Sequence, residues 1–441
     1  MVPTFVERRK GEEPKDSIQL STLFEIDSET FAVLTDTQNN KTILSDAPSE
    51  LGEEAGLMMR GQEAAPGVQV DLDTKSKIEG YGVFTFSYGP VTSGIPEAGG
   101  FRFVTYGERV TKVIPMINFK KRAVELAVVG MDPENALLIL ERSAGNFSAS
   151  YSTCFVTAVE DALGIEVPQE AKWTRAVAME LERIYNHLHV FAREAEAASQ
   201  NVATAQTSAL MEQVLRLNAK YFGHRYLFGV NDIGGVKSGL SEKEKRNELF
   251  RSLRSITSEF SKIIEYFLSS RIFLDRLQNT AKLSKEDALS LGAVGPAARG
   301  SGFDWDDRVT FPIQPYNDIF VNVETEIGTD TMARIMVRIN EITSSTTVIQ
   351  ELLDKMPSDG IKFKTSKQPR LDFSLCRIES PSGDLIQAVQ VGEKGKIKKL
   401  HIRPSSLANW MPFAKSLEGN VFTDFQFAFE SFGLNYADSD R

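Results

Sequence analysis

Apolar and polar residues alternate along the chain in two regions, as they do in half-buried strands. The first region contains the runs GVFTFSYG, GGFRFVTYG and ERVTKVIPMI, which begin near Tyr81 and are joined by glycine-containing loops. The second lies beyond Lys364 and contains LDFSLCRIE, LIQAVQV and KIKKLHIRP, separated by the turns PSGD and GEKG. The pattern predicts a small antiparallel sheet on the N-terminal side and a three-stranded meander on the C-terminal side.

Between these regions the apolar residues follow the period of helices. After Pro168 a stripe of five apolar residues is spaced by four, three, four and three positions, and it consists of Val177, Leu181, Ile184, Leu188 and Phe191. One long helix with a buried face is therefore expected here. The whole chain is predicted to be an α+β protein, with a central bundle of long helices flanked by the two sheets.

Helix ends are marked by capping residues. Asp132 before Pro133 is typical of a helix start, and Gly164 should end a helix that covers about 148–163. The sequence SEKE at 241–244 is typical of a capping box that opens a helix continuing through YFLSSRIFLDRL. A further helix should begin at a Thr or Asp cap in TDTMARIM and end before Pro357.

Residues 1–75 are weakly patterned and are interpreted as an appended N-terminal segment, separate from a main domain at 76–441. They contain one predicted hairpin, TFAVLTDTQNNKTILS, in which Asn39 and Asn40 tolerate the backbone of a tight turn.

Composition narrows the class of protein. The 441 residues carry a net charge of -10, which disfavours a nucleic-acid partner, because such proteins concentrate Lys and Arg. No apolar run reaches the roughly 18–20 residues that span a bilayer, and the first residues lack the apolar stretch of a signal peptide. The only cysteines, Cys154 and Cys376, exclude a disulfide framework and fit a reducing cytoplasm.

No single motif is a strong catalytic signature, because a P-loop, a GxGxxG turn, HExxH and paired CxxC are all missing. The four histidines are scattered. His187 and His189 point about 200° apart on one helix, so one ion cannot bind both. They are interpreted as structural or surface residues.

The order of several segments resembles the large subunit of nickel-iron hydrogenases and the 49 kDa core subunit of respiratory complex I, above all the energy-converting, group 4 members. The resemblance covers about four-fifths of the chain, from Ser87 to Arg441. It rests on GP at 89–90, GERVTKVIPMINFKKRAVE, LERSAGNFSASYS, ELERIYNHL, NDIGGV, GPAARGSGFDWDDR, MVRINEI, IRPSSLAN and NYADSDR.

In hydrogenases, the segments matching LERSAGNFS and NYADSDR would each carry a Cys-x-x-Cys pair, and the four thiolates hold nickel and iron. The corresponding positions here are Ala144, Phe147, Asn435 and Asp438. Nickel and low-spin iron require soft thiolates. The resemblance therefore implies that the nickel-iron centre is absent and that the chain binds no metal. Cys154 lies about two helical turns, roughly 10 Å, beyond the Phe position, so both cysteines are expected in the core.

Other family positions survive. Arg122 and Glu125 match an Arg and a Glu of the family, while a family His has become Lys121. In hydrogenase relatives that Glu relays protons, and Glu125 is a candidate for the same role. Alternatively, Glu125 only pairs with Lys121 four residues earlier on a helix surface. The His and Tyr that contact quinone in complex I relatives have no counterpart here, although Tyr151 is available to donate a proton.

The loop RGSGFDWDDR contributes further candidates. Arg299, Asp304 and Asp306 supply fixed charges that can sit at the cavity and couple charge to a membrane arm. The alternative is a structural ion-pair turn. Arg183 and His187, one turn apart, are expected to brace the bundle near the neighbouring iron-sulfur subunit.

The function implied by the resemblance is that of a peripheral core subunit on the cytoplasmic face of the cell membrane. Electrons would pass from a [4Fe-4S] cluster in a neighbouring small subunit to an acceptor, with quinone as the first candidate, and the transfer would be coupled to ion translocation. The expected partners are that iron-sulfur subunit, other cytoplasmic-arm subunits and antiporter-like membrane subunits, with no nucleic acid. The chain itself would bind no cofactor directly, apart from the quinone if that is the acceptor. The alternative is a catalytically inactive scaffold, in which the pocket is free to collapse onto Phe147.

Overall fold

The computed structural model describes residues 80–92, 97–363 and 373–441, together with four strands of the N-terminal segment. The chain divides into two compact units, 1–79 and 80–441. The strands of the first unit are β1 (Glu7–Arg9), β2 (Ile18–Ile26), β3 (Glu29–Asp36) and β4 (Lys41–Asp46), in the order β1-β4-β3-β2. β3 and β4 pair antiparallel, with Asp36 opposite Lys41, in the segment where a hairpin is predicted. The predicted turn residues Asn39 and Asn40 lie outside the described residues.

The second unit begins with the predicted antiparallel sheet, made of β5 (Val83–Tyr88), β6 (Gly100–Tyr106) and β7 (Arg109–Met116). One face of this sheet contributes Phe101 and Phe103 to a cluster of aromatic rings. These rings pack edge-on against Phe425, with centroids 4.9 and 5.4 Å away. The sheet is thereby fixed to helices from the end of the chain.

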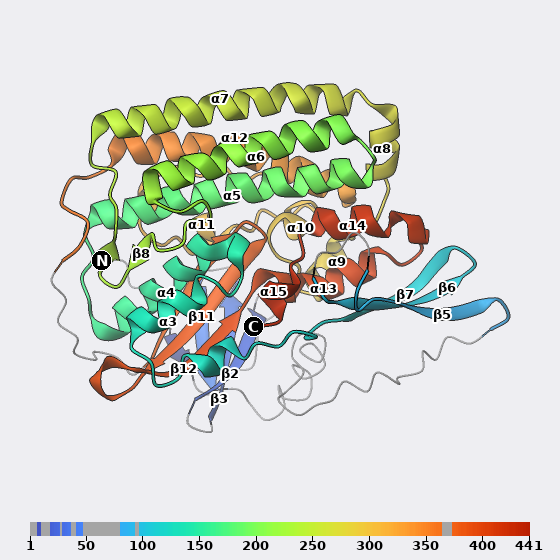
Figure 1. The fold of residues 1–441 in the computed structure, drawn as a ribbon. Helices are drawn as coiled ribbons and strands as arrows, with labels where there is room; N and C mark the ends of the chain where they lie inside the picture. Colours follow the sequence, from blue (N-terminus) through green and yellow to red (C-terminus); the bar gives the residue numbers. More distant parts are fainter. Residues whose placement is uncertain are drawn as a thin grey trace. The chain divides into compact units, whose positions relative to one another are not determined.

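Four long helices form a layer, in which they run side by side (Figure 1). They are α5 (Gln169–Ala197), α6 (Asn201–Phe222), α7 (Lys243–Leu268) and α12 (Thr331–Lys355). The five residues of the predicted apolar stripe on α5 are all buried. The side chain of Asp330 caps α12 by accepting a hydrogen bond from Ala333 N at 2.9 Å, which confirms the predicted start of this helix.

The prediction for α7 was wrong at both ends. The helix begins at Lys243 with Glu242 at the N-cap and no side-chain capping bond, so SEKE does not form a capping box. It ends at Leu268, and a separate helix, α8 (Arg271–Leu277), follows. The hydroxyl of Ser269 donates to the carbonyl of Tyr266, and such local bonds of serine compete with helical ones.

A second layer lies beneath the long helices. The predicted meander consists of β10 (Phe373–Ser380), β11 (Gly383–Val391) and β12 (Ile397–Arg403), all antiparallel. Helix α4 (Ser148–Leu163) packs on this sheet and against α5, and it ends at Gly164 as predicted. Helices α2 (Val124–Ala127) and α3 (Pro133–Leu140) complete this side, with Asp132 at the N-cap of α3.

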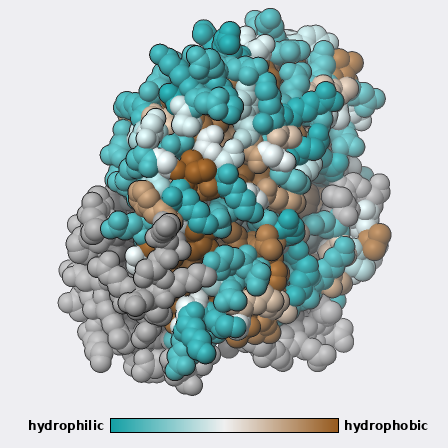
Figure 2. Space-filling model, turned by 60° about the vertical axis from the view of Figure 1, so that its left-hand side comes forward, coloured by the Kyte–Doolittle hydropathy of each residue, from teal (hydrophilic) through white to brown (hydrophobic). Residues whose placement is uncertain are grey.

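The remaining elements are short. They are α9 (Lys285–Ser290), α10 (Gly295–Arg299), α11 (Asp307–Thr310), α13 (Ser405–Ser416), α14 (Phe425–Phe432), α15 (Tyr436–Ser439), the strands β8 (Asn231–Asp232) and β9 (Gly235–Val236), and single turns at Gly145–Phe147, Tyr316–Asp318, Glu393–Gly395 and Phe422–Asp424. The predicted α+β class is confirmed. Among the described residues, every helix is too short or too polar to cross a membrane. Figure 2 shows one face, where hydrophilic residues cover most of the described surface and hydrophobic ones form small separate spots.

Candidate functional site

The two polar stretches that would hold metal in hydrogenases meet in the fold, although about 290 positions separate them. Arg122 joins them directly, because its Nη2 donates to the carbonyl of Ser143 at 2.6 Å and also to the carbonyl of Ala437. A second link comes from α4, where the hydroxyl of Tyr151 donates to Asp438 Oδ1 at 2.5 Å. Side-chain hydrogen bonds thus join the two stretches, which a metal would join in hydrogenases.

The four positions that match metal ligands are used for packing and capping. Ala144 and Phe147 are buried and offer no donor atom. The side-chain oxygen of Asn435 caps α15 by accepting from Asp438 N at 3.0 Å. Asp438 is 1% exposed and also accepts from Ser406 N at 3.0 Å. These side chains do not fit a nickel-iron centre, because none supplies a thiolate.

Both cysteines lie in the core, as predicted. The thiol of Cys154 donates to the carbonyl of Cys376 at 3.3 Å, and burial raises its pKa well above the ordinary value. The sulfur of Cys154 is therefore not poised as a thiolate ligand. In the described part of the chain, no group of three or more His, Cys, Asp or Glu side chains is arranged to hold a metal ion.

A cavity of about 320 Å³ lies where the two stretches meet. Its wall is formed by the turn that contains Phe147, by one face of α5, by α14 and by the last stretch. The residues that line the cavity include Gly145, Asn146, Phe147, Asn186, His189, Val190, Arg193, Arg338, Phe429, Glu430, Asn435 and Tyr436. Phe147 is part of the wall and leaves the cavity open.

Tyr436 is the unusual polar group in this wall. Its side chain is 2% exposed, and among the described residues its hydroxyl has no hydrogen-bond partner. The ring lies against Gly99, where a Cβ would come within 2.0 Å of it, so only glycine leaves room for the ring. Burial raises the pKa of Tyr436 above its ordinary value, which keeps the hydroxyl protonated.

The structure places Glu125 outside the lining of this cavity. Its carboxylate accepts from Ile402 N at 2.7 Å and lies 3.2 Å from Arg441 Nε and 3.7 Å from His401 Nδ1. The alternative pairing with Lys121 was wrong. Ala123 adopts a left-handed conformation, with φ 52°, so α2 begins only after it and Lys121 is left exposed outside the helix.

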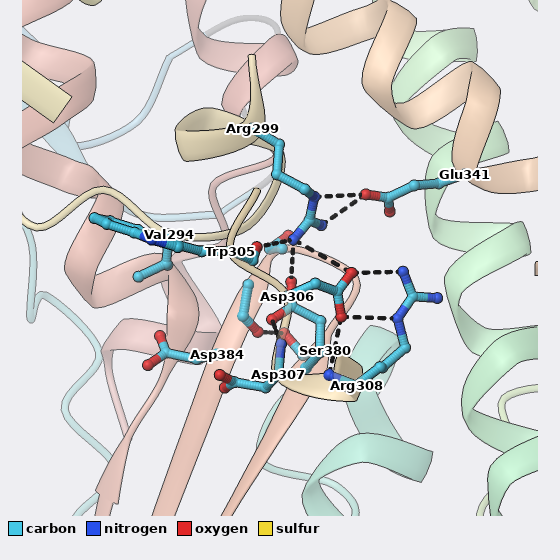
Figure 3. A network of polar contacts seen from close by, with 12 residues as sticks. Val294, Arg299, Trp305, Asp306, Asp307, Arg308, Glu341, Ser380 and Asp384 are labelled. Carbon is cyan, nitrogen blue, oxygen red and sulfur yellow. Dashed lines mark hydrogen bonds and ion pairs between the residues drawn. The ribbon is translucent and has the colours of Figure 1, made fainter. Parts of the chain in front are cut away.

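Arg299 and Asp304 are not brought together. Arg299 is fully buried, and its guanidinium lies 2.6 Å from Glu341 Oε1 and 2.7 Å from Glu379 Oε1 (Figure 3). Asp304 is exposed and takes no part in this network. Asp306 is the buried carboxylate of the loop, 2.6 Å from Arg308 Nη2 and 3.5 Å from Arg299 Nη1.

The network continues into the helix layer. His187 Nε2 lies 2.7 Å from Glu341 Oε2, and Arg308 Nη1 donates to Glu180 Oε2 at 3.1 Å. Burial lowers the pKa of His187 to about 4, so its ring is neutral at pH 7. Figure 3 shows the part of this network around the loop. Arg183 and His187 therefore brace the bundle from within its core, as expected.

Three buried carboxylates of this network were not predicted from the sequence. Glu180, Glu341 and Glu379 are each at most 5% exposed. A signal was available for Glu180, since it lies between Val177 and Ile184 on the predicted apolar stripe, where a charge requires a buried partner.

Comparisons with known proteins give two family matches, both within residues 80–441. Residues 122–196 match the model of nickel-dependent hydrogenases, and residues 202–372 match that of the 49 kDa subunit of respiratory-chain NADH dehydrogenase. The alpha subunit of the membrane-bound hydrogenase of Pyrococcus furiosus is 29% identical over 80% of this chain and 86% of its own length. A subunit of the NADH-quinone oxidoreductase of Koribacter versatilis is 28% identical over 76% of this chain and 90% of its own length.

A solved structure has the same fold. A chain of the membrane-bound sulfane sulfur reductase, an archaeal respiratory membrane complex, superposes with a TM-score of 0.76 at 22% identity and covers 81% of this chain and 98% of its own length. The relatives are thus subunits of multisubunit oxidoreductase complexes. The chain is thus similar to two related groups of proteins, the nickel-dependent hydrogenases and the 49 kDa subunits of respiratory-chain NADH dehydrogenase.

Proposed function

We propose that this chain is the core subunit of a membrane-bound oxidoreductase complex and that the cavity beside Phe147 receives the electron acceptor. The observation that carries the proposal is the open volume of about 320 Å³ at the meeting point of the two stretches. A subunit kept only as a scaffold has no need of such a space, and large apolar side chains could fill it without loss of function.

The lining of the cavity suits a flat acceptor with carbonyl oxygens, for which a quinone is the first candidate. Phe429 and Tyr436 form one aromatic wall, with their rings stacked 6.2 Å apart. The hydroxyl of Tyr436 and the amides of Asn146 and Asn186 are polar groups at that wall. The unpartnered hydroxyl of Tyr436 is a ready donor to a carbonyl oxygen. The name of the NADH-quinone oxidoreductase relative supports the same choice.

Electrons would come from a [4Fe-4S] cluster in a neighbouring iron-sulfur subunit, because the described residues include no donor set of their own for a redox metal. The complex would contain further cytoplasmic-arm subunits and antiporter-like membrane subunits, and would couple electron transfer to ion translocation. This chain would lie on the cytoplasmic face of the membrane without a nickel-iron centre.

The second candidate is the inactive scaffold. It is favoured by the bonds of Arg122 and the Tyr151–Asp438 pair, which join the two stretches without any ligand. It does not account for the open cavity or for the buried hydroxyl of Tyr436.

The test uses the complex purified from native membranes. Its iron-sulfur clusters are reduced, a short-chain quinone is added, and reoxidation of the clusters is followed by absorbance. We expect fast reoxidation in the wild type and at least tenfold slower reoxidation in Phe147→Trp, because the larger ring enters the cavity. Phe84→Trp is the matched control, since Phe84 is 51% exposed on β5.

Equal rates in the wild type and in both variants would place the acceptor elsewhere. No reoxidation of the wild type by any quinone, with its clusters fully reduced, would favour the scaffold or an acceptor of another class.

A further inference from the structure

Helix α5 carries a buried carboxyl group directly behind the cavity wall. Val190 and Arg193 line the cavity, and Glu194 lies one turn beyond Val190 on the same side of the helix. Glu194 is fully buried, and among the described residues neither of its oxygens has a hydrogen-bond partner. A buried carboxyl group without such a partner is rare and calls for an explanation.

Charged groups from two other helices face Glu194. Arg334 and Arg338 come from α12, and Glu430 comes from α14. Both guanidinium groups are buried and bond neutral atoms, for example Ala281 O at 3.0 Å and Phe432 O at 2.8 Å. Within the described residues neither arginine makes an ion pair with a carboxylate.

Glu430 lies in the cavity wall and also acts electrostatically on Glu194. It lines the cavity and accepts hydrogen bonds from Arg193 Nη2 at 2.9 Å and Gln426 Nε2 at 2.6 Å. Burial and the charge of Glu430 raise the pKa of Glu194 well above its ordinary value, while Arg334 and Arg338 oppose the shift. Two carboxyl groups close together in a low-dielectric site do not both ionise easily.

We propose that Glu194 and Glu430 hold one proton between them and deliver it, through Glu430, to an acceptor reduced in the cavity. The inference rests on the proposed function. A quinone that takes two electrons from the neighbouring iron-sulfur subunit needs two protons to become a quinol. The carboxyl pair supplies them one at a time: its O–H bond breaks, an O–H bond forms on a quinone oxygen, and the pair takes up a proton from solvent before the second transfer.

The groups around the Glu194–Glu430 pair accommodate both its protonated and its deprotonated form. When the proton leaves, the second carboxylate charge is compensated by Arg334 and Arg338. The proton is replaced from the solvent side of α5, where the side chains of Arg193 and Glu196 are 22% and 56% exposed. Glu194 acts through Glu430 and does not itself touch the acceptor.

The test follows quinone-driven reoxidation of the reduced complex over a range of pH. Glu194→Gln preserves shape and removes the transferable proton. In the wild type the rate is constant at low pH and falls as pH rises through the pKa of the pair. The variant should be about tenfold slower or more and should lose that falling limb, because proton transfer to the reduced acceptor then becomes limiting. Glu194→Asp should recover part of the rate.

Glu265→Gln is the control, because Glu265 is exposed on α7. A Glu194→Gln complex that is reoxidised as fast as the wild type, with the same pH profile, would overturn the inference.

A second measurement does not depend on the acceptor. Infrared spectra of the complex at neutral pH should contain a protonated carboxyl band that Glu194→Gln lacks. If this band is the same in both proteins, the inference fails even when quinone is reduced normally. If the band behaves as expected but quinone never reoxidises the clusters, the proposed function fails instead.

Discussion

At the residue scale, the buried charged groups determine which side chains of the core are protonated. Around Arg299, three guanidinium groups (Arg183, Arg299 and Arg308) meet four carboxyl groups (Glu180, Glu341, Glu379 and Asp306), while His187 is neutral. Arg299 is shared by Asp306, Glu341 and Glu379, so within this set four carboxyl groups share three cations. Burial raises the pKa of Glu379 to about 8, so this group keeps the extra proton.

The proton on Glu379 predicts a dependence of stability on pH. Since the folded pKa lies above the unfolded value of about 4.3, the stabilisation by protonated Glu379 is complete below pH 4.3 and is lost as pH rises through about 8. Glu379→Gln should remove this loss. In urea unfolding, its stability relative to the wild type should rise by about 2–4 kcal/mol between pH 5 and pH 8.5. Glu265→Gln should follow the wild-type curve, and parallel curves for Glu379→Gln would contradict the assignment.

The site residues show where reasoning from sequence stops. Arg122, Ala144, Phe147, Asn435 and Asp438 could be located because motifs mark them. The long-range partners could not be deduced, because Arg122 bonds the carbonyl of Ala437 and Asp438 accepts from Tyr151, about 300 positions away along the chain.

At the scale of elements, turns and caps carried most of the information. The strands of both sheets, the ends of α4 and the start of α12 follow from Gly, Asp and the alternation of apolar residues. Helix α6 was not predicted, because it lacks a Pro or Gly at its start and has many Ala and Thr residues in place of a strong apolar stripe. The break after α7 was also missed, because the helical pattern of apolar residues continues on both sides of the two serines that separate the helices.

The cap of α12 gives a prediction at this scale. Asp330→Ala removes the bond to Ala333 N and a second bond, in which Asp330 Oδ2 accepts from Asn279 N at 2.7 Å. The free energy of unfolding should fall by about 1–2 kcal/mol, measured by urea titration. Asp354→Ala, near the C-terminal end of the same helix, should cost less than about 0.5 kcal/mol or stabilise slightly, because a carboxylate is unfavourable there. Equal losses in both variants would rule out the capping explanation.

At the scale of the folded unit of residues 80–441, the helix layer, the first sheet and the C-terminal helices converge on one cavity. The sequence predicted the first sheet and three of the four long helices, but neither the C-terminal helices nor the way in which these parts meet, which depends on side-chain shape. The clearest instance is Gly99, just before β6, on which the ring of Tyr436 rests.

Substitution at Gly99 tests this convergence. In Gly99→Ala the new methyl group would overlap the ring of Tyr436, so the ring must leave its place in the cavity wall. We expect a loss of about 1–3 kcal/mol in unfolding free energy together with slower quinone-driven reoxidation of the complex. Gly80→Ala is the control, because its Cβ would meet only Val83 at an ordinary 3.6 Å. A Gly99→Ala complex with wild-type stability and rate would show that the wall tolerates a displaced Tyr436.

The buried arginine network also has a consequence for heat tolerance. The cost of stripping water from an ion falls as temperature rises, whereas the stabilisation from buried apolar surface levels off. The share of the stability that comes from the ion pairs of Arg183, Arg299 and Arg308 therefore grows on warming. We expect the helix layer to be among the last parts of the chain to unfold.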